Sequence, residues 1–374
     1  MDSAAAAGVS LLTIDLGAVA RNWQQLRDHA TPAACGAAVK ADAYGTGADR
    51  VVPALAAAGC RAFFVATLAE GIAVSETLGA RWPEADVFVL NGPPSARLDL
   101  LISARLIPVL NSLGDIDLWA AAARRRAVAL PAVLHVDTGM SRLGLPPAEV
   151  ECLAAEPARL HGLDLRFIMT HLACADTPDH PLNDRQRQRF ADALSRLPHV
   201  PTSFANSAGV FLGPAFHGDL VRPGAALYGV NPTPKKPNPM SQVVRLQGRI
   251  LQVREIDRNE SVGYGASHSA VRRTTIATVA AGYADGFLRS LSNRGRGLIG
   301  GVSVPLIGRV SMDLVTFDVT EAPADLVHPG ELIELIGPDN PVDAVAAAAG
   351  TIGYEILTSL GHRYARTYVG GSEE

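Results

Sequence analysis

Short apolar segments alternate with amphipathic segments over the first two thirds of the chain. The apolar segments are five or six residues long, rich in Val, Ile and Phe, and apolar at consecutive rather than alternate positions. This pattern is typical of parallel strands that are covered on both faces. It predicts eight strands, at residues 36–40, 62–67, 86–91, 107–111, 132–137, 166–171, 202–207 and 219–224.

The segments between these strands have the apolar spacing of helices, as in residues 112–128 and 183–197. Eight strands separated by helices over roughly 200 residues is the count of a (β/α)8 TIM-type barrel. A doubly wound sheet is the alternative, but the regularity of the eight units favours closure into a barrel.

A Pro/Asn/Lys-rich run at residues 231–239 ends this alternation and is interpreted as a linker. The segments beyond it are strand-like and punctuated by Gly and Pro, with one helical stretch at about 341–360. An early strand at residues 9–15 precedes a helix that Asp15 is placed to cap. The chain is therefore predicted to be α/β plus β. Residues 1–14 form an N-terminal strand that packs with the C-terminal domain, 15–238 the barrel, and 239–374 a mostly β domain.

Composition narrows the class of protein. The 374 residues are 48% hydrophobic and 19% charged with a net charge of −4, so a large core is expected, and neither nucleic acid nor a membrane surface is indicated as a partner. No apolar run is long enough for a membrane span, and the first residues lack the pattern of a signal peptide. The four cysteines lack metal-type spacing and are expected to be reduced thiols, with no metal site. A cytoplasmic protein is expected.

Polar residues end the predicted barrel strands, where the active site of such a barrel lies. These residues are Lys40, Asp137, His171, Asn206, Ser207 and Arg222. The loops after strands seven and eight are the usual phosphate site of this fold. There Ser207 offers a hydroxyl group and Gly224 lets backbone N–H groups approach an anion.

Lys40, the predicted phosphate cradle and Arg222 together indicate pyridoxal phosphate (PLP). A deprotonated lysine forms a Schiff base with an aldehyde, and burial or neighbouring cations lower the lysine pKa enough to allow this. PLP requires both an aldehyde-binding lysine and a phosphate site. From the residues alone, an ion-paired lysine with no catalytic role stays open as the alternative.

Nine motifs in order resemble those of the alanine racemases. They are AAVKADAYGTG (37–47), VDTGMSRLG (136–144), THLACAD (170–176), FANSAG (204–209), VRPGAALYG (221–229), VGYGASH (262–268), GYADG (282–286), GRVSMD (308–313) and TIGYEILTSLGHRYAR (351–366). They span nearly the whole chain. The resemblance implies a PLP-binding barrel followed by a β domain, assembled as a head-to-tail homodimer whose two sites are shared between the subunits.

The resemblance also implies roles for individual residues. Lys40 matches the Schiff-base lysine and one of two catalytic bases, and Tyr264 matches the opposite base, supplied by the other subunit. Arg222 matches the arginine that faces the pyridine nitrogen, with His171 hydrogen-bonded behind it. Arg142 matches the contact to the phenolic oxygen and the substrate. The remaining cofactor-binding positions are Tyr44, Asn206, Ser207, Gly224, Ala225 and Tyr354, and the remaining substrate positions, from the partner, are Met312 and Tyr283.

Two positions depart from the family pattern. His135 stands where the family often has a carbamylated lysine that orients Arg142, and a histidine cannot form that carbamate. A neutral or charged imidazole, or a bound anion, is then expected to do the orienting. Ser311 stands where many members have a cysteine.

The residues and the resemblance favour an alanine racemase that interconverts L- and D-alanine by a two-base PLP mechanism, for peptidoglycan synthesis or for catabolism. A broader amino-acid racemase or a decarboxylase of the same architecture is the first alternative. Decarboxylases of this shape place a carboxylate at the pyridine nitrogen, whereas the matching residue here is Arg222. A PLP-carrying barrel without activity is the second, and the presence of Tyr264 and Met312 in a full β domain argues against it.

Overall fold

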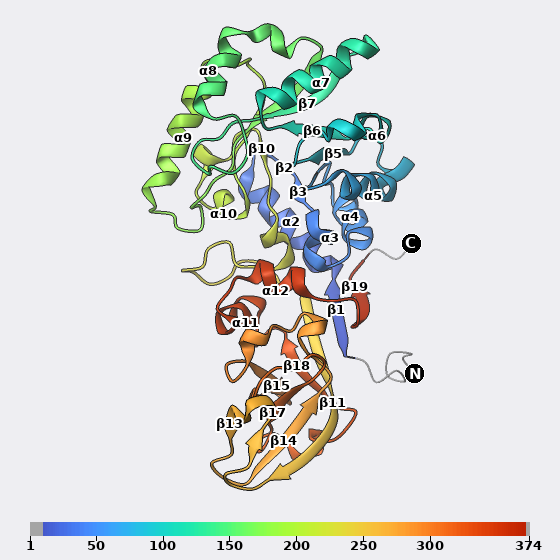
Figure 1. Cartoon of the computed structure of the whole chain (residues 1–374), viewed down its shortest axis with the longest axis vertical. Helices are drawn as coiled ribbons and strands as arrows, with labels where there is room; N and C mark the ends of the chain where they lie inside the picture. Colours follow the sequence, from blue (N-terminus) through green and yellow to red (C-terminus); the bar gives the residue numbers. More distant parts are fainter. Residues whose placement is uncertain (1–9, 372–374) are drawn as a thin grey trace.

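Two large sheets organise the computed structural model, which describes residues 10–371. Figure 1 places a parallel sheet surrounded by helices at one end of the long axis and a largely antiparallel sheet at the other. One continuous apolar core includes residues of both sheets. Among the described residues, no helix combines the length and apolarity needed to cross a bilayer.

The parallel sheet is a nearly closed barrel with the order β2-β10-β9-β8-β7-β6-β5-β4-β3. Its strands are β2 (Ala34–Cys35), β3 (Ala37–Ala38), β4 (Ala62–Val65), β5 (Asp86–Val89), β6 (Ile107–Leu110), β7 (Leu130–His135), β8 (Leu163–Met169), β9 (Thr202–Ser203) and β10 (Leu220–Val221). Only Gly36 separates β2 from β3, so these two pieces act as one strand and bring the two ends of the sheet together. A Cβ at Gly36 would lie 2.8 Å from the Ala62 carbonyl oxygen, which explains the glycine. The predicted (β/α)8 barrel is confirmed.

Helices connect the barrel strands as the sequence pattern predicts. They are α2 (Leu16–Ala30), α3 (Lys40–Gly45), α4 (Ala48–Ala57), α5 (Leu68–Leu78), α6 (Leu98–Ser103), α7 (Leu113–Arg126), α8 (Pro147–Ala155), α9 (Pro181–Leu194) and α10 (Ser207–Val210), with short 3-10 turns η1 (Gly79–Arg81), η2 (Ser95–Arg97), η3 (Pro157–Leu160), η4 (Pro214–Phe216) and η5 (Ala225–Tyr228). Strands β9 and β10 are shorter than predicted. At the end of β9 the Asn206 side chain accepts a hydrogen bond from the Gly209 N–H and starts α10 instead.

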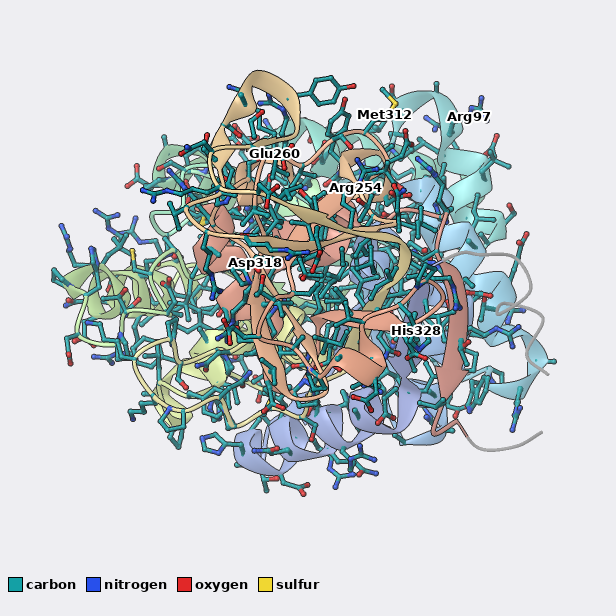
Figure 2. The ribbon with its side chains drawn as sticks, turned by 90° about the horizontal axis from the view of Figure 1, so that it is seen from below. Arg97, Arg254, Glu260, Met312, Asp318 and His328 are labelled. Atoms are coloured by element: carbon teal, nitrogen blue, oxygen red, sulfur yellow. The ribbon has the colours of Figure 1, made fainter. Side chains whose placement is uncertain are left out.

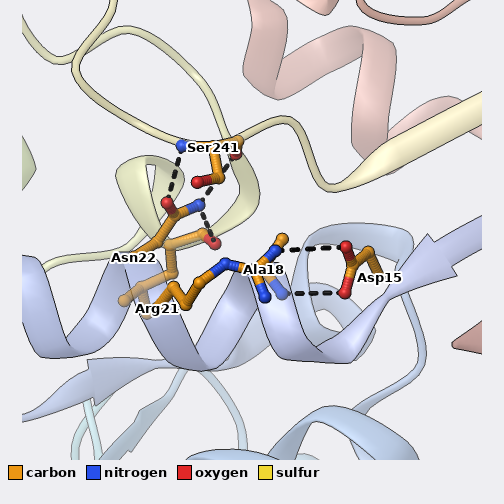
Figure 3. Close-up of polar contacts among 6 residues, drawn as sticks. Asp15, Ala18, Arg21, Asn22 and Ser241 are labelled. Carbon is orange, nitrogen blue, oxygen red and sulfur yellow. Dashed lines mark hydrogen bonds and ion pairs between the residues drawn. The ribbon is translucent and has the colours of Figure 1, made fainter. Parts of the chain in front are cut away.

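Helix α2 begins where the sequence predicts. The Asp15 carboxylate accepts a hydrogen bond from the Ala18 N–H (2.8 Å) and pairs with Arg21, as Figure 3 shows. One turn further on, the buried Asn22 amide bonds the backbone of Ser241, which leads into the second sheet. The first barrel helix is thereby fixed to the chain segment that leaves the barrel.

The second sheet and its attachments hold the remaining elements. They are β1 (Leu11–Asp15), β11 (Val244–Ile256), β12 (Ser261–Val262), β13 (His268–Ser269), β14 (Thr274–Val279), β15 (Arg296–Ile299), β16 (Val302–Pro305), β17 (Val315–Asp318), β18 (Leu332–Ile336), β19 (Ala365–Val369), helices α11 (Val342–Ala349) and α12 (Gly353–Ser359), and turns η6 (Tyr264–Ala266), η7 (Tyr283–Asp285), η8 (Arg289–Leu291) and η9 (Ala324–Leu326). The single predicted helical stretch is two helices, and α12 contacts α3 of the barrel.

Strand β1 joins the second sheet rather than the barrel. It pairs antiparallel with β11 and parallel with β19. This is the packing that we expected for the N-terminal strand. Residues 1–9 of that predicted segment, and residues 372–374, lie outside the described part of the chain.

Candidate active site

A cavity of about 470 Å³ lies at the carboxyl ends of the barrel strands. Helix α12 of the β domain and the residue before it border one side of the cavity, through Ile352, Tyr354, Glu355 and Thr358. All ten residues predicted to bind the cofactor line this cavity: Lys40, Tyr44, Arg142, His171, Asn206, Ser207, Arg222, Gly224, Ala225 and Tyr354. Residues from five strand ends and from the C-terminal helix therefore meet in one place.

Lys40 stands at the start of an unusual turn. The four residues that follow it, Ala41 to Tyr44, have φ between 52° and 56°, so α3 is a left-handed turn rather than a right-handed helix. This conformation costs roughly 1–2 kcal/mol for each non-glycine residue. Surrounding contacts must hold it in place. Strained backbone of this kind is concentrated at functional sites.

Contacts from three elements hold the turn. The Glu70 carboxylate at the start of α5 accepts hydrogen bonds from the Ala41 N–H (2.8 Å) and, with its other oxygen, from the Ala66 N–H (2.8 Å). The Arg366 guanidinium of β19 donates to the Gly45 carbonyl (2.8 Å). A Cβ at Gly45 would overlap the Leu357 carbonyl of α12. The turn is thus tied to the barrel and to the second sheet.

The environment of Lys40 suits a nucleophilic amine. Burial lowers the pKa of Lys40 most, the nearby Arg142 guanidinium lowers it further, and Glu70 opposes them by raising it. The net effect is a lowered pKa, which increases the fraction of neutral amine near neutral pH. Only the neutral amine can attack an aldehyde.

Beside Lys40 the chain forms a cradle lined by hydroxyl groups. The buried Tyr44 ring stacks on Tyr228 with a centroid distance of 4.7 Å. A Cβ at Gly224 would overlap the Tyr44 hydroxyl, so the bare glycine keeps this corner open. The Ser207 hydroxyl oxygen accepts hydrogen bonds from the Gly224 and Ala226 N–H groups (2.9 and 3.2 Å), and its own hydrogen can donate to an anion.

This cradle fits the phosphate of PLP, although its details differ from the prediction. We expected the Gly224 N–H to face the anion, but it donates to Ser207. Among the described residues that line the cavity, Ser207, Tyr44 and Tyr354 offer hydroxyl donors to an anion. With Lys40 on the same cavity, the residues present match the aldehyde and the phosphate of PLP.

Arg222 is the buried cation of the cavity. One Nη donates to the Ser203 hydroxyl (2.5 Å) and the other to the Thr170 carbonyl (2.7 Å). Burial lowers the pKa of Arg222 to about 9, which still leaves it protonated at neutral pH. Within residues 10–371 these two groups, rather than the expected His171, accept its hydrogen bonds. Burial, and then the charges of Arg222 and Arg142, hold the pKa of His171 well below its usual value, so its imidazole is neutral.

His135, the departure from the family pattern, is a neutral imidazole. It is buried, and its Nδ1 lies 2.8 Å from the Asn111 amide oxygen. Burial lowers the pKa of His135 to about 3, helped by the charge of Arg222. The amide nitrogen of Asn111 donates to two backbone carbonyls, so its oxygen is the acceptor and His135 Nδ1 carries the proton. Of the two protonation states, the structure supports the neutral imidazole.

The loop that leads to Arg142 has its own support. The Asp137 carboxylate accepts hydrogen bonds from the N–H groups of Gly139, Met140 and Ser141, at 2.9, 2.9 and 3.1 Å. The sequence placed Asp137 at a strand end but did not indicate this bracing role. These bonds order the loop up to Ser141, the residue before Arg142.

The other three predicted residues, Tyr264, Tyr283 and Met312, lie outside the cavity and in the β domain. Their side chains are exposed, at 72%, 44% and 54% respectively. Figure 2 shows Met312 at the edge of the molecule, pointing away from the ribbon. The delivery of these three side chains to a partner's cavity stays a prediction.

Glu70, Arg366 and Asn111 were missed by the sequence analysis. For Glu70 a signal was present, because Thr67 and Glu70 have the spacing of a capping box at the start of α5. For Asn111 a signal was also present, because it is the polar last residue of the predicted strand 107–111. Arg366 acts through a contact with Gly45, 321 residues away, and no local pattern reports that.

Comparison with known proteins covers almost the whole chain. Residues 14–232 match the alanine racemase N-terminal domain and residues 243–368 the alanine racemase C-terminal domain. An alanine racemase of Rhodospirillum rubrum is 56% identical over 97% of each chain, and a catabolic alanine racemase of Mesorhizobium japonicum is 48% identical over 99% of this chain and 95% of its own. The crystal structure of Bartonella henselae alanine racemase with covalently bound pyridoxal phosphate superimposes with a TM-score of 0.91 at 41% identity, covering 96% of this chain and 99% of that one. From these matches and the fit of its cavity to PLP, the chain belongs to the alanine racemase family of PLP-dependent enzymes.

Proposed function

We propose that the protein interconverts L-alanine and D-alanine by a two-base mechanism, with PLP held at Lys40. The observation that carries this is the single cavity in which a lysine of lowered pKa, a buried arginine and a phosphate cradle meet. The names of its relatives support alanine as the substrate. When bound, PLP withdraws electrons from the amino acid and makes its α-hydrogen acidic.

Arg222 bears on which reactions the site favours. Its guanidinium stays charged at neutral pH and would donate a hydrogen bond to the pyridine nitrogen, leaving that nitrogen unprotonated. A carboxylate there would instead keep the nitrogen protonated and stabilise the carbanion more strongly in the ring. We infer that Arg222 restrains side reactions such as transamination. It also argues against the decarboxylase alternative.

Racemisation removes a proton from one face of the substrate and returns one to the other face. Two bases on opposite faces do this without turning the substrate. We propose that the Lys40 amine is one base and the Tyr264 hydroxyl of the partner subunit is the other. The Tyr264 side chain is exposed in its own chain, which supports the proposal that it enters the cavity of the partner subunit in a homodimer. Met312 and Tyr283 would complete the substrate pocket from the same side.

Several finer points are proposed with this function. The domain bounds are 1–14, 15–238 and 239–374. Tyr354, together with the tyrosines contributed by the partner subunit, would narrow the cavity towards a methyl side chain, which favours alanine over the larger substrates of a broader racemase. Relatives include catabolic alanine racemases as well as ones without that qualifier, so both a peptidoglycan and a catabolic role stay open. The cytoplasmic location stays a prediction.

The lysine content of the chain gives a direct test. The sequence has only three lysines, Lys40, Lys235 and Lys236, and the last two are exposed in the linker. The purified protein is incubated with PLP, reduced with borohydride, digested and mapped by mass spectrometry, and racemisation is assayed with alanine, serine and lysine. We expect PLP on Lys40 alone and fastest turnover of alanine. The Lys40→Ala variant should lose both, and the matched Lys236→Ala variant should lose neither. Label on Lys235 or Lys236, or activity in Lys40→Ala, would contradict the proposal.

A further inference from the structure

Arg363 joins two acidic side chains that the mechanism has not used. Its Nε lies 3.1 Å from the Asp285 carboxylate and one Nη lies 2.8 Å from the Asp313 carboxylate. The Asp285 side chain is only 7% exposed, whereas Arg363 and Asp313 are each 53% exposed. Burying the Asp285 carboxylate costs desolvation free energy, and a half-exposed arginine offsets only part of that cost. We therefore asked which segments of the chain this ion pair holds in place.

The two acidic partners of Arg363 lie in the turns that carry Tyr283 and Met312. The Tyr283 N–H donates to the Ser311 carbonyl (3.1 Å), and the next N–H donates to the Met312 carbonyl (3.0 Å). A Cβ at Gly282 would overlap the Met312 carbonyl, so the turns lie backbone against backbone. The two turns therefore form one unit, with a carboxylate at each end.

Arg363 offsets the repulsion within this unit. Burial raises the pKa of Asp285 most, and the charge of Asp313 raises it further, whereas the Gly282 N–H and Arg363 lower it. Without Arg363 the two carboxylates would repel each other with no arginine between them, and only the backbone hydrogen bonds would hold the two turns in register.

We propose that Arg363 is a positioning residue for substrate binding: through Asp285 and Asp313 it fixes Tyr283 and Met312 where they reach the cavity of the partner subunit. This inference rests on the proposed function, because it requires a site shared between subunits. Arg363 touches neither the substrate nor the cofactor in this arrangement. Its effect is on the shape of the surface that one subunit offers to the other.

A competing explanation places the effect of Arg363 in its own subunit. The neighbouring Arg366 donates to Gly45, at the end of the turn that starts with Lys40, and to the Leu360 and Gly361 carbonyls. A change at Arg363 could disturb the cavity of its own chain through this route. The test must therefore separate the two subunits.

Kinetics of homodimers give the first readout. We expect Arg363→Gln to raise the KM for alanine about tenfold with kcat within about threefold of wild type, as for a lost contact that orders a binding surface. Arg363→Lys should recover only part of the affinity, since one ammonium cannot bond both carboxylates as the planar guanidinium does. The matched control is Arg245→Gln. Arg245 is also 53% exposed and pairs with the largely buried Glu334 at 2.6 Å, within the second sheet. An unchanged KM in Arg363→Gln, or the same rise in Arg245→Gln, would overturn the proposal.

If Arg363→Gln does not fold, Asp313→Asn tests the same link from its exposed end. It leaves the Arg363–Asp285 pair in place and should raise the KM in the same direction. A KM equal to wild type in folded Asp313→Asn would overturn the proposal.

Mixed dimers give the decisive readout. In a dimer of one Lys40→Ala subunit and one Arg363→Gln subunit, the cavity that keeps Lys40 receives its turns from the subunit with intact Arg363. We expect this dimer to show the wild-type KM. A KM that stays raised would place the effect in the subunit's own cavity and overturn the proposal. A dimer of Lys40→Ala with Tyr264→Phe should regain activity, because one of its cavities is complete. Failure there would refute the shared site itself, and so separates the two claims.

Discussion

Replacing Glu70 with glutamine should destabilise the turn after Lys40 and change the titration of the lysine. One Glu70 oxygen accepts the Ala41 N–H, and the other accepts the Ala66 and Thr67 N–H groups, at 2.8, 2.8 and 3.1 Å. Glutamine has a single acceptor oxygen. With that oxygen turned to the side that has two donors, its amide nitrogen faces the Ala41 N–H, which loses its acceptor.

The size of the effect follows from the contacts. The Ala41 N–H is exposed, so water can replace the lost acceptor and the cost is that of one net hydrogen bond, about 0.5–1.5 kcal/mol. The unfolding midpoint of a domain of this size shifts by roughly 2–4 °C for each kcal/mol, so a fall of a few degrees is expected. Glu70 raises the pKa of Lys40 in the wild type, so its neutralisation should lower that pKa further. The neutral amine would then be present at lower pH.

The assay follows the rate of PLP capture by apoenzyme against pH, together with thermal unfolding. Glu70→Gln should shift the midpoint of the capture profile to lower pH and lower the unfolding temperature. Glu149→Gln is the matched control, since Glu149 is also half-buried and accepts a backbone N–H, that of Leu113, away from the cavity. Because glutamine keeps one acceptor oxygen for the Leu113 N–H, this variant should change the unfolding temperature less than Glu70→Gln does, and it should not move the capture profile. An upward shift in Glu70→Gln, or no shift, would refute the assignment of Glu70 as the charge that opposes burial at Lys40.

Three further predictions concern the cavity. Since His135 is a neutral imidazole, racemase activity of the wild type should not respond to bicarbonate, whereas His135→Lys should gain a response; a clear stimulation of the wild type would count against the account. Arg222→Glu should increase transamination relative to racemisation, measured as pyruvate formed per turnover, and an unchanged ratio would remove the role given to the arginine. Gly224→Ala should weaken PLP binding in equilibrium titration by about 1–3 kcal/mol, because the new methyl group clashes with Tyr44. Gly114→Ala is the control and should bind PLP normally, because a Cβ there would lie 3.6 Å from its nearest neighbour, the Ser112 hydroxyl. Equal affinities of the two variants would argue against the cradle.

The barrel was predictable because its strands are buried on both faces. In the apolar runs 62–67 and 86–91, residues 63–65 and 87–89 are all buried, as expected for strands covered on both faces. The ends of elements were less predictable. Strand β9 stops at Ser203 because the Asn206 side chain caps a helix there, and the sequence pattern alone extended the strand to residue 207. The split of β2 and β3 at Gly36 depends on the close approach of the neighbouring strand.

The candidate site also has a part that could be predicted from the sequence and a part that could not. Residues at strand ends, such as Lys40 and Arg222, could be predicted because barrel topology brings those ends together. The left-handed turn after Lys40 could not, since alanine, aspartate and tyrosine have no preference for positive φ strong enough to predict it. It exists because Glu70 and Arg366, from elsewhere in the fold, hold it.

Hydrogen exchange in D2O tests the two-base claim most directly. L-alanine and D-alanine are each incubated with wild type and with Tyr264→Phe, and NMR follows deuterium at Cα alongside inversion. We predict that the wild type inverts both enantiomers and that every inverted product carries deuterium. Tyr264→Phe should exchange the α-hydrogen of one enantiomer only, through Lys40, with almost no inversion. Inversion by Tyr264→Phe at the wild-type rate, or equal exchange of both enantiomers, would contradict the account.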